Sequence, residues 1–163
     1  MSPRTAAQIA WLEPRLGADL ALAWAGTSGW FEDADLVAAR DPGRTITPVD
    51  LAATSGVDAA VQFLVDRLKT QQGELTALGH REYGSRHYEL IGQPNVERTR
   101  NLIKLYVLEA LTQEPRVAKV VSANVYATTS PPRDTVAIDL TVLLLGQDVP
   151  VNFVVPFSLE VGG

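Results

Sequence analysis

The tripeptide Glu114-Pro115-Arg116 places an acid and a base on either side of a proline. Proline disfavours the α conformation at the preceding residue and cannot continue a helix, so the tripeptide predicts a helix stop followed by a rigid corner. In one interpretation, Arg116 contacts the last carbonyls of the helix as a C-terminal cap. In the other, the corner is a docking point at which the arginine binds a partner carboxylate in a bidentate pair. The residues alone favour the cap.

Four glutamates could in principle supply the paired carboxylates of a glycoside hydrolase: Glu74, Glu82, Glu89 and Glu114. That reaction requires two carboxyl groups that face each other, one of them with a raised pKa. No feature of the sequence brings two of these side chains together. The sequence therefore gives no support to carboxylate chemistry.

Metal binding and nucleophilic catalysis are no better supported. The histidines His80 and His87 flank Glu82, but they lack the helical spacing of a zinc protease pair and a third ligand. Ser85 lies in Tyr-Gly-Ser-Arg-His, which is not the Gly-x-Ser-x-Gly of a nucleophile elbow. We therefore predict no metal, no cofactor and no catalytic residue, and a protein that is not an enzyme.

The composition is that of an ordinary folded chain, with 46% hydrophobic and 20% charged residues in 163. A net charge of −5 argues against nucleic-acid binding, which needs clustered cations. The chain has no cysteine, which excludes disulfides and thiolate chemistry. No apolar run reaches the roughly 20 residues that span a bilayer, and the first residues do not form a signal peptide. We expect an intracellular protein with no membrane insertion.

Two helices precede the tripeptide and must position it. Ser55 and Asp58 have capping-box spacing, and a helix from there ends near Gly73, which can adopt the left-handed cap. Asn95 is expected to cap the second helix, which runs to the Pro115 stop. The expected apolar stripes are Val57, Ala60, Val61, Leu64, Val65 and Leu68 in the first helix, and Ile103, Tyr106, Val107, Ala110 and Leu111 in the second.

After Arg116 the apolar period changes from that of a helix to that of a strand. Three strands are expected, over 117–127, 136–144 and 149–157, with turns between them. Pro150 and Pro156 cannot donate to a ladder, so the last strand is predicted to be an edge. The expected fold class is α+β, an antiparallel β-meander packed by two main helices, with an N-terminal extension.

Residues 1–50 are expected to form that extension of a single domain, 1–163, whose core is 51–159. A short helix is predicted from Thr5 to Pro14, and a strand from Leu16 to Trp24 with its even positions buried. The stretch 26–48 is rich in turn residues and is expected to be a long loop. We expect no internal repeat.

Three groups of motifs, taken in order, resemble the lysozyme-like baseplate wedge proteins of contractile phage tails. Relatives of that family include phage protein W and the type VI secretion subunit TssE. The motifs are Gly73-Glu74-Leu75 through Leu78-Gly79-His80, then Tyr83-Gly84-Ser85-Arg86 with Glu89-Leu90-Ile91-Gly92-Gln93-Pro94-Asn95, then Glu114-Pro115-Arg116-Val117. The closing Asn152-Phe153-Val154-Val155-Pro156-Phe157 is also similar to the family's last strand. His87-Tyr88 departs from the Leu-His expected after Ser-Arg.

The resemblance implies a structural role in a sixfold baseplate. Glu114, Pro115 and Arg116 would anchor the subunit to the helical core bundle formed by the other wedge subunits. The last strand, with Val151, Phe153 and Val155, would receive the sheath protein by strand addition, and the inner tube or hub would be a further contact. Such a protein would be made in the bacterial cytoplasm and then become part of the assembled particle, a phage, a tailocin or another injection machine. The alternatives are a peptidoglycan hydrolase, that is, a tail lysozyme, and a small binding module unrelated to tails.

Overall fold

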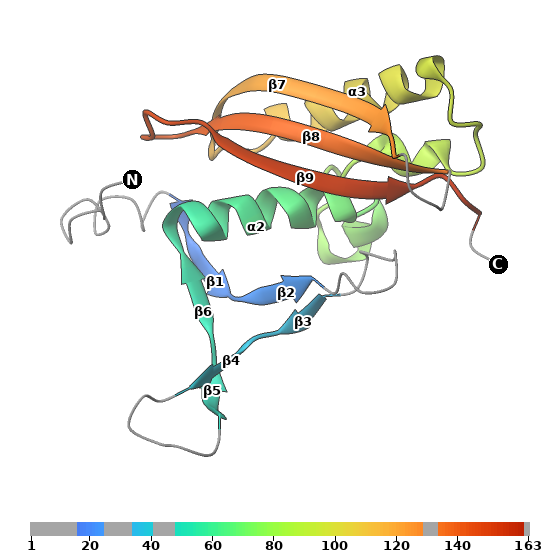
Figure 1. Ribbon diagram of the computed structural model, residues 1–163. Helices are drawn as coiled ribbons and strands as arrows, with labels where there is room; N and C mark the ends of the chain where they lie inside the picture. The colour runs from blue at the N-terminus through green and yellow to red at the C-terminus, as the bar shows by residue number, and fades with distance from the viewer. Residues whose placement is uncertain (1–15, 25–33, 41–47, 129–133, 162–163) are drawn as a thin grey trace. The chain divides into compact units, whose positions relative to one another are not determined.

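The computed structural model describes residues 16–24, 34–40, 48–128 and 134–161 (Figure 1). The chain divides into two compact units, Met1–Gln62 and Phe63–Gly163, and the boundary falls inside helix α2. The predicted boundary between extension and core lies twelve residues earlier, at 50/51. The first unit contains β1 (Ala18–Leu20), β2 (Leu22–Trp24), β3 (Ala34–Leu36), β4 (Ala38–Arg40), β5 (Pro48–Leu51), β6 (Ala53–Ser55) and the start of α2 (Gly56–Lys69). The second contains η1 (Glu74–Leu78), η2 (Arg86–Leu90), α3 (Glu97–Thr112), β7 (Val117–Ala127), β8 (Thr135–Leu144) and β9 (Val151–Ser158).

The second unit is built on a three-stranded antiparallel sheet with the order β7-β8-β9. The sheet is a meander. Helix α3 lies on one face of the sheet and packs along β7 (Figure 1). The α+β fold class predicted from the sequence is confirmed. The central strand β8 supplies much of the core, because its even-numbered side chains are fully buried: Val136, Ile138, Leu140, Val142 and Leu144.

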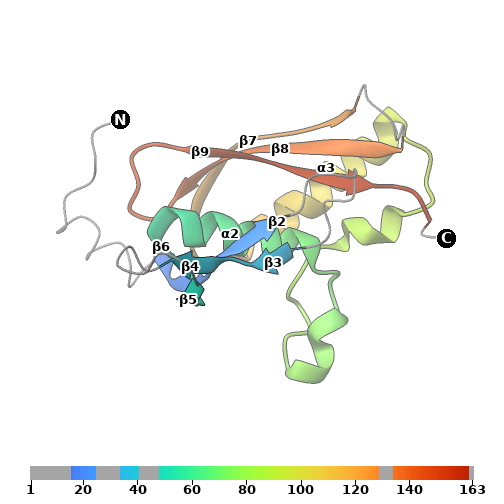
Figure 2. The same ribbon diagram turned by 60° about the horizontal axis from the view of Figure 1, so that its bottom comes forward.

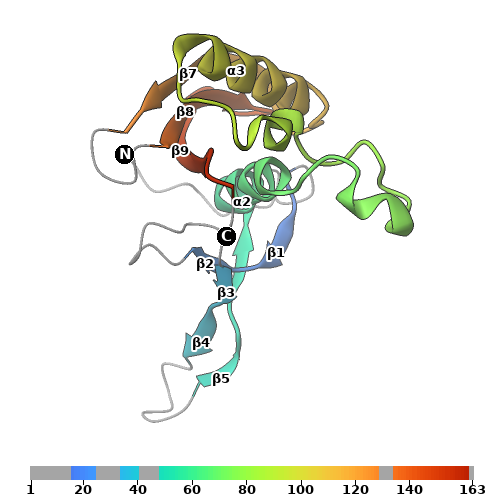
Figure 3. The same cartoon turned by 90° about the vertical axis from the view of Figure 1, so that its right-hand side faces the viewer.

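Helix α3 presents a buried stripe to this sheet, as its apolar period predicts. Ile103, Val107 and Leu111 are fully buried and Ala110 is nearly so, whereas Tyr106 is only half-buried. Leu64 and Leu68, two members of the predicted α2 stripe, are also fully buried in the second unit. Figures 2 and 3 show the segment that carries η1 projecting away from α3 and the sheet.

The beginning of α3 differs from the prediction. The helix starts at Glu97, its N-cap is Val96, and no side chain caps it. Asn95 instead accepts hydrogen bonds from the Arg100 guanidinium, through its backbone oxygen at 3.1 Å and its side-chain Oδ1 at 2.9 Å. The prediction of Asn95 as the cap was wrong because the arginine one turn ahead competes for the same oxygen atoms.

The end of α2 also differs in detail. The helix ends at Lys69, and the Tyr88 hydroxyl donates to the Lys69 carbonyl at 2.8 Å. Gly73 does adopt a left-handed conformation, with φ of 92°, but it precedes η1 instead of ending α2. Because Tyr88 binds a terminal carbonyl of the helix, it acts as a cap supplied by a distant segment.

The first unit consists of three two-stranded antiparallel ribbons, β1–β6, β2–β3 and β4–β5. A single strand from Leu16 to Trp24 was expected, but two short strands form and pair with different partners. The predicted loop over 26–48 was wrong for its described part, since β3, β4 and the start of β5 lie within it. The helix predicted at Thr5–Pro14 and most of the turn between β7 and β8 lie outside the described residues.

The three ribbons meet at a junction closed by three backbone hydrogen bonds. Ala21 donates to Ala52 at 2.7 Å, Ala52 donates to Val37 at 2.7 Å, and Val37 donates to Ala21 at 2.9 Å. A short repeat that has Asp-Leu in common lies at each corner: Ala18-Asp19-Leu20-Ala21, Ala34-Asp35-Leu36-Val37 and Val49-Asp50-Leu51-Ala52. No internal repeat was expected from the sequence, because a match of two residues is too short to stand out there. In the part of the chain that is described, no helix is both long and apolar enough to cross a bilayer.

Candidate functional site

The corner formed by Glu114-Pro115-Arg116 connects the end of α3 to the start of β7. The Glu114 N–H still donates to Leu111, one turn back in the helix, at 3.2 Å. Its carbonyl then accepts the Val117 N–H at 3.0 Å, and the Arg116 carbonyl accepts the Leu145 N–H at 2.8 Å. The backbone turns at the proline and enters the sheet within three residues, which confirms the predicted helix stop.

Glu114 lies at the centre of a buried arrangement of charges. Its Oε2 accepts a hydrogen bond from the Arg67 guanidinium at 3.3 Å, and Oε1 is paired with the Arg116 guanidinium. Glu114 and Arg67 are 4% and 8% exposed, whereas the Arg116 side chain keeps 28% of its surface. Two guanidinium groups thus hold one buried carboxylate, and such charges are tolerated inside a protein only when they are paired.

Aromatic rings cover both arginines of this triad. The Arg116 guanidinium lies 4.2 Å from the Phe63 ring centroid, and the Arg67 guanidinium lies 4.4 Å from that of Tyr83. Burial raises the pKa of the Tyr83 hydroxyl, while the charge of Arg67 acts in the opposite direction. Stacking and ion pairing together fix the direction of each guanidinium. The accessible part of the corner is therefore Pro115 and a preoriented Arg116.

The tripeptide was identified as a candidate site from the sequence, but the residues that support it were not. Arg67 is 47 positions away from Glu114, on another helix, so no local pattern connects them. Arg116 was expected either to cap the helix or to serve as a docking residue, and the structure shows its guanidinium paired with the Glu114 carboxylate. An open groove of about 400 Å³ lies beside the triad, lined by Arg67, Gly79, His80, Arg81, Glu82, Tyr83 and Gln113.

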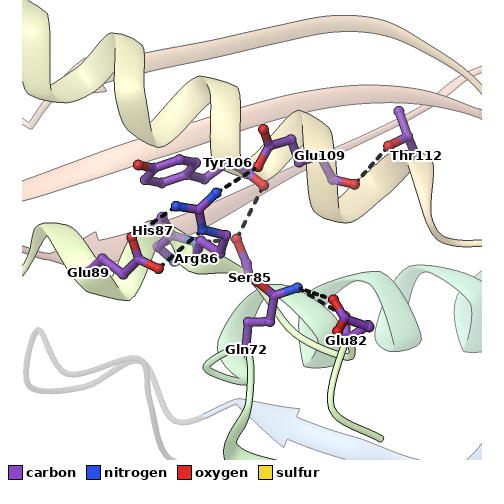
Figure 4. Close-up of polar contacts among 9 residues, drawn as sticks. All are labelled: Gln72, Glu82, Ser85, Arg86, His87, Glu89, Tyr106, Glu109 and Thr112. Carbon is purple, nitrogen blue, oxygen red and sulfur yellow. Dashed lines mark hydrogen bonds and ion pairs between the residues drawn. The ribbon is translucent and has the colours of Figure 1, made fainter.

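A second polar cluster occupies the turn that follows Gly84 (Figure 4). The Ser85 hydroxyl lies 2.7 Å from His87 Nδ1, a serine–histidine distance of the kind found in hydrolases. However, both residues are only 1% exposed, and the histidine ring packs edge-on against Phe157 with centroids 4.4 Å apart. Burial lowers the pKa of His87 to about 3. A substrate cannot reach this pair, so its role is to pack η2 against β9.

Arg86 points the other way and lies on the surface of α3 (Figure 4). Its guanidinium pairs with Glu89 at 3.1 Å and Glu109 at 3.8 Å, and lies 4.5 Å from the Tyr106 ring centroid. These contacts hold η2 on α3, but the side chains are roughly half exposed, so each pair stabilises the fold by little.

The residues considered for metal or carboxylate chemistry do not converge. His80 is exposed and His87 is buried, and the described residues contain no group of three acids or histidines that could hold a metal ion. Glu74, Glu82 and Glu89 are exposed, and both oxygens of Glu114 are occupied by arginines.

The edge of β9 is the remaining candidate surface. The Leu159 backbone N–H donates to the Asp134 carbonyl at 2.9 Å. From this pair the register of β8 and β9 runs without a break from Thr135↔Ser158 to Val142↔Val151. In an antiparallel ladder the bonded pairs alternate, so the odd-numbered residues of β9 exchange hydrogen bonds with β8. The predicted contact residues Val151, Phe153 and Val155 therefore direct their backbone groups towards β8.

The even-numbered residues of β9 direct their backbone groups away from the sheet. Among them, Asn152 and Val154 retain an outward N–H, whereas Pro156 has none. None of the other described strands pairs with this side of β9, so the predicted edge is confirmed. The edge can accept a further strand over a short segment centred on Val154, whose side chain is 50% exposed.

No family model matches the chain, and no curated protein matches its sequence. The fold is similar to that in the crystal structure of a "putative tail lysozyme" from Geobacter sulfurreducens, with a TM-score of 0.55. The two chains are 23% identical, and the match covers 68% of this chain and 97% of that one. At this level of identity the likeness establishes a shared fold.

Proposed function

We propose that this protein is a structural subunit of the baseplate of a contractile tail or injection machine, and that it starts the sheath. The observation that carries the proposal is the open β9 edge, on a fold similar to that of a protein named a "putative tail lysozyme". The motifs noted in the sequence support it. A free strand edge is a ready template for an extended segment of a sheath subunit, since main-chain bonds then supply affinity.

The register of β9 indicates which of its backbone atoms would bind that segment. Backbone groups of Asn152 and Val154 face the partner, while Val151, Phe153 and Val155 hold β9 on the sheet. Pro156 ends the available stretch on one side and Pro150 on the other. These two prolines limit the docking segment and protect the edge from indiscriminate pairing.

The variant Val154→Pro tests this edge. Its missing N–H is directed away from β8, so the sheet is expected to persist while sheath docking falls at least tenfold. Val154→Thr keeps the N–H and serves as the matched control. Docking is measured by co-sedimentation with purified sheath protein, and the fold by circular dichroism. Undiminished docking of a folded Val154→Pro protein would refute strand addition at β9.

The corner at Glu114-Pro115-Arg116 is proposed as the anchor to the other wedge subunits. Arg116 would bind a partner carboxylate with the part of its guanidinium that remains accessible, and Glu114 with Phe63 would hold it in position. Preorganised side chains lose less conformational entropy on binding. The buried Glu114 contributes from inside the molecule and does not touch the partner.

Arg116→Ala is the informative variant, and Arg86→Ala is its matched control. Both arginines pair with a glutamate and stack on an aromatic ring, but only Arg116 belongs to the tripeptide. Assembly with purified wedge subunits, followed by electron microscopy, is expected to fail for Arg116→Ala and to proceed for Arg86→Ala. Equal assembly of the two variants would contradict the anchor.

A tail lysozyme remains the second candidate, because the similar structure carries that name. We propose that this chain is not an enzyme, on the ground that none of its candidate carboxylates combines burial with a free oxygen. Purified protein added to a peptidoglycan suspension should leave the turbidity unchanged. Clearing that is lost in Glu82→Gln or Glu89→Gln would establish the hydrolase instead.

A further inference from the structure

The three-ribbon junction of the first unit presents an apolar face that the proposed function does not use. Because side chains alternate along a strand, residues directly before and after each junction residue lie on the same face. At the three corners these are Leu20 and Leu22, Leu36 and Ala38, and Leu51 and Ala53. All six are leucine or alanine. We call these six residues the leucine face.

The leucine face is open to solvent. Leu20 is 42% exposed, and Leu36 and Leu51 are each 44% exposed. Ala38 and Ala53 are exposed as well, and only Leu22 is half-buried. Single exposed leucines are common in proteins, but here the strand register pairs Leu20 with Ala53, Leu22 with Leu36 and Ala38 with Leu51, which connects all six apolar residues around the junction.

The aspartates of the repeat close the strand edges at the same points. Asp19 Oδ1 accepts the Leu20 N–H at 2.7 Å, and Asp35 and Asp50 accept the equivalent N–H groups of Leu36 and Leu51 at 2.9 and 2.8 Å. Each of these N–H groups points away from the paired strand, so each aspartate blocks an edge that would otherwise recruit another strand. A partner would therefore dock through its side chains and would not add a strand to these edges.

Charge indicates which partner fits. Residues 1–62 contain eight acidic and four basic residues, a net charge of −4 out of −5 for the whole chain. Asp19, Asp35 and Asp50 are exposed, and because each carboxylate accepts an outward-pointing N–H it lies at a ribbon edge, which is the rim of the face. A second copy of the chain would bring two acidic rims together, which opposes self-association.

We propose that the leucine face is a docking surface for a partner protein whose contact region is apolar at its centre and carries lysine or arginine at its rim. The apolar centre would be buried, and the basic rim would pair with Asp19, Asp35 and Asp50. The surface belongs to the first unit, whereas the corner and the β9 edge belong to the second, so the proposal does not depend on the function proposed for those.

The test uses the full-length protein and two synthetic twelve-residue peptides, one alternating leucine and lysine and one alternating leucine and glutamate. Binding is measured by fluorescence anisotropy at low and high salt. We expect the leucine–lysine peptide to bind at least tenfold more tightly than the acidic one, and its binding to weaken as salt rises. Hydrogen exchange with the bound peptide should show protection at residues 18–24, 34–39 and 50–55.

Three variants assign the binding to its parts. Leu20→Ser/Leu36→Ser/Leu51→Ser removes the apolar centre, and Asp19→Asn/Asp35→Asn/Asp50→Asn removes the charge while keeping the oxygen that accepts each N–H. Either triple variant should lose at least tenfold in affinity. Leu78→Ser/Leu105→Ser/Leu145→Ser, three exposed leucines of the second unit, should bind as the unchanged protein does.

The proposal is overturned if the leucine–lysine peptide fails to bind, binds no better than the acidic peptide, or binds the leucine variant equally well. It is also overturned if sedimentation shows a dimer that the leucine variant abolishes, since the face would then be an interface between copies. Because the aspartate variant retains the edge hydrogen bonds, its affinity reports on charge even if the leucine variant unfolds.

Discussion

Glu114 is the residue on which the corner between α3 and β7 depends, because its carboxylate is shared by two guanidinium groups. Burial alone would make this carboxylate costly, and the pair with Arg67 compensates for it. The tripeptide therefore has an interior role and an exterior one. Glu114 stabilises the fold, and Arg116, whose side chain keeps 28% of its surface exposed, is the residue proposed to contact a partner.

Replacing Glu114 with alanine should destabilise the protein by about 3–5 kcal/mol, since Arg67 would be left buried without its partner. Glu89→Ala removes an exposed pair with Arg86, which solvent screens, and should leave the free energy of unfolding nearly unchanged. Urea unfolding at pH 7 measures both free energies. Similar, small losses for the two variants would show that the triad is not a stabilising unit.

His87 makes stability depend on pH. Its pKa is lowered by burial to about 3, below the roughly 6.5 expected in the unfolded chain. The unfolded state therefore binds a proton first as pH falls, and stability that is full above pH 6.5 is lost progressively towards pH 3. Between pH 7 and pH 5 this group should reduce the free energy of unfolding by about 2 kcal/mol.

The pH dependence of urea unfolding checks this prediction in two variants. In His87→Phe the contribution should disappear, and the protein is expected to start from a different stability at pH 7 because Ser85 loses its contact. His80→Gln changes the exposed histidine and should retain the full dependence. A His87→Phe protein with the same slope as the unchanged protein would be inconsistent with a neutral buried imidazole.

At the scale of elements, the turn 83–86 is fixed by contact with the end of α2. The Ser85 backbone N–H donates to the Thr70 carbonyl at 2.9 Å, and the Gln72 backbone N–H donates to the Ser85 carbonyl at 3.2 Å. Gly84 lies between these bonds with φ of 101°, and a Cβ there would approach the Thr70 carbonyl oxygen to 2.5 Å. This explains the glycine in the Tyr-Gly-Ser-Arg motif, since a side chain would push the two segments apart.

Gly84→Ala should therefore destabilise the protein more than Gly79→Ala does. Both positions have positive φ, but a Cβ at Gly79 meets no atom within 4 Å. The strain of the backbone is common to the two, and the clash with α2 should add about 1–3 kcal/mol at Gly84. Thermal unfolding of the two variants provides the comparison, and equal midpoints would show that the segments separate without cost.

The elements with long periodic patterns were predictable, and those set by distant contacts were not. Helix α3 and the strands β7, β8 and β9 carry many apolar residues at a regular period, and their type was correct. The ribbons contain strands of three or four residues, too short to show a period. Only the dipeptide Asp-Leu is common to the three short repeats in the ribbons. The repeat becomes evident in the structure, where the residue after each leucine (Ala21, Val37 and Ala52) joins the same ring of backbone hydrogen bonds.

The candidate site shows the same division. Glu114, Pro115 and Arg116 were identified because a proline stop is a local signal. The groups that complete the corner, Arg67 and Phe63, come from another helix and leave no trace in the local sequence. The free edge of β9 was predictable from its prolines, but which backbone groups face outward required the register.

At the scale of the whole molecule, the two units differ in how their backbone bonds are protected. Strand β8 is paired on both sides and buried, whereas each ribbon of the first unit has only two strands. Isolated two-stranded ribbons are only marginally stable in water. The two units should therefore open with different free energies.

Hydrogen exchange measures this difference directly. Amides of Ile138 and Leu140 should exchange at least about 100-fold more slowly than those of Ala21, Val37 and Ala52, which corresponds to about 2.7 kcal/mol in opening free energy. Exchange followed by mass spectrometry on the full chain resolves these segments. Uniform protection across both units would indicate a single cooperative structure instead.

The ribbons also have a topological consequence. The chain enters them through Gly17 and leaves them through Gly56, and the Gly56 N–H donates to the Gly17 carbonyl at 3.1 Å. Residues 18–55 thus form a cassette whose two ends are already joined by a hydrogen bond. The segment could therefore be excised, or inserted into a surface loop of another protein. Because its first and last residues lie close together, the insertion would not force apart the two loop residues that flank it.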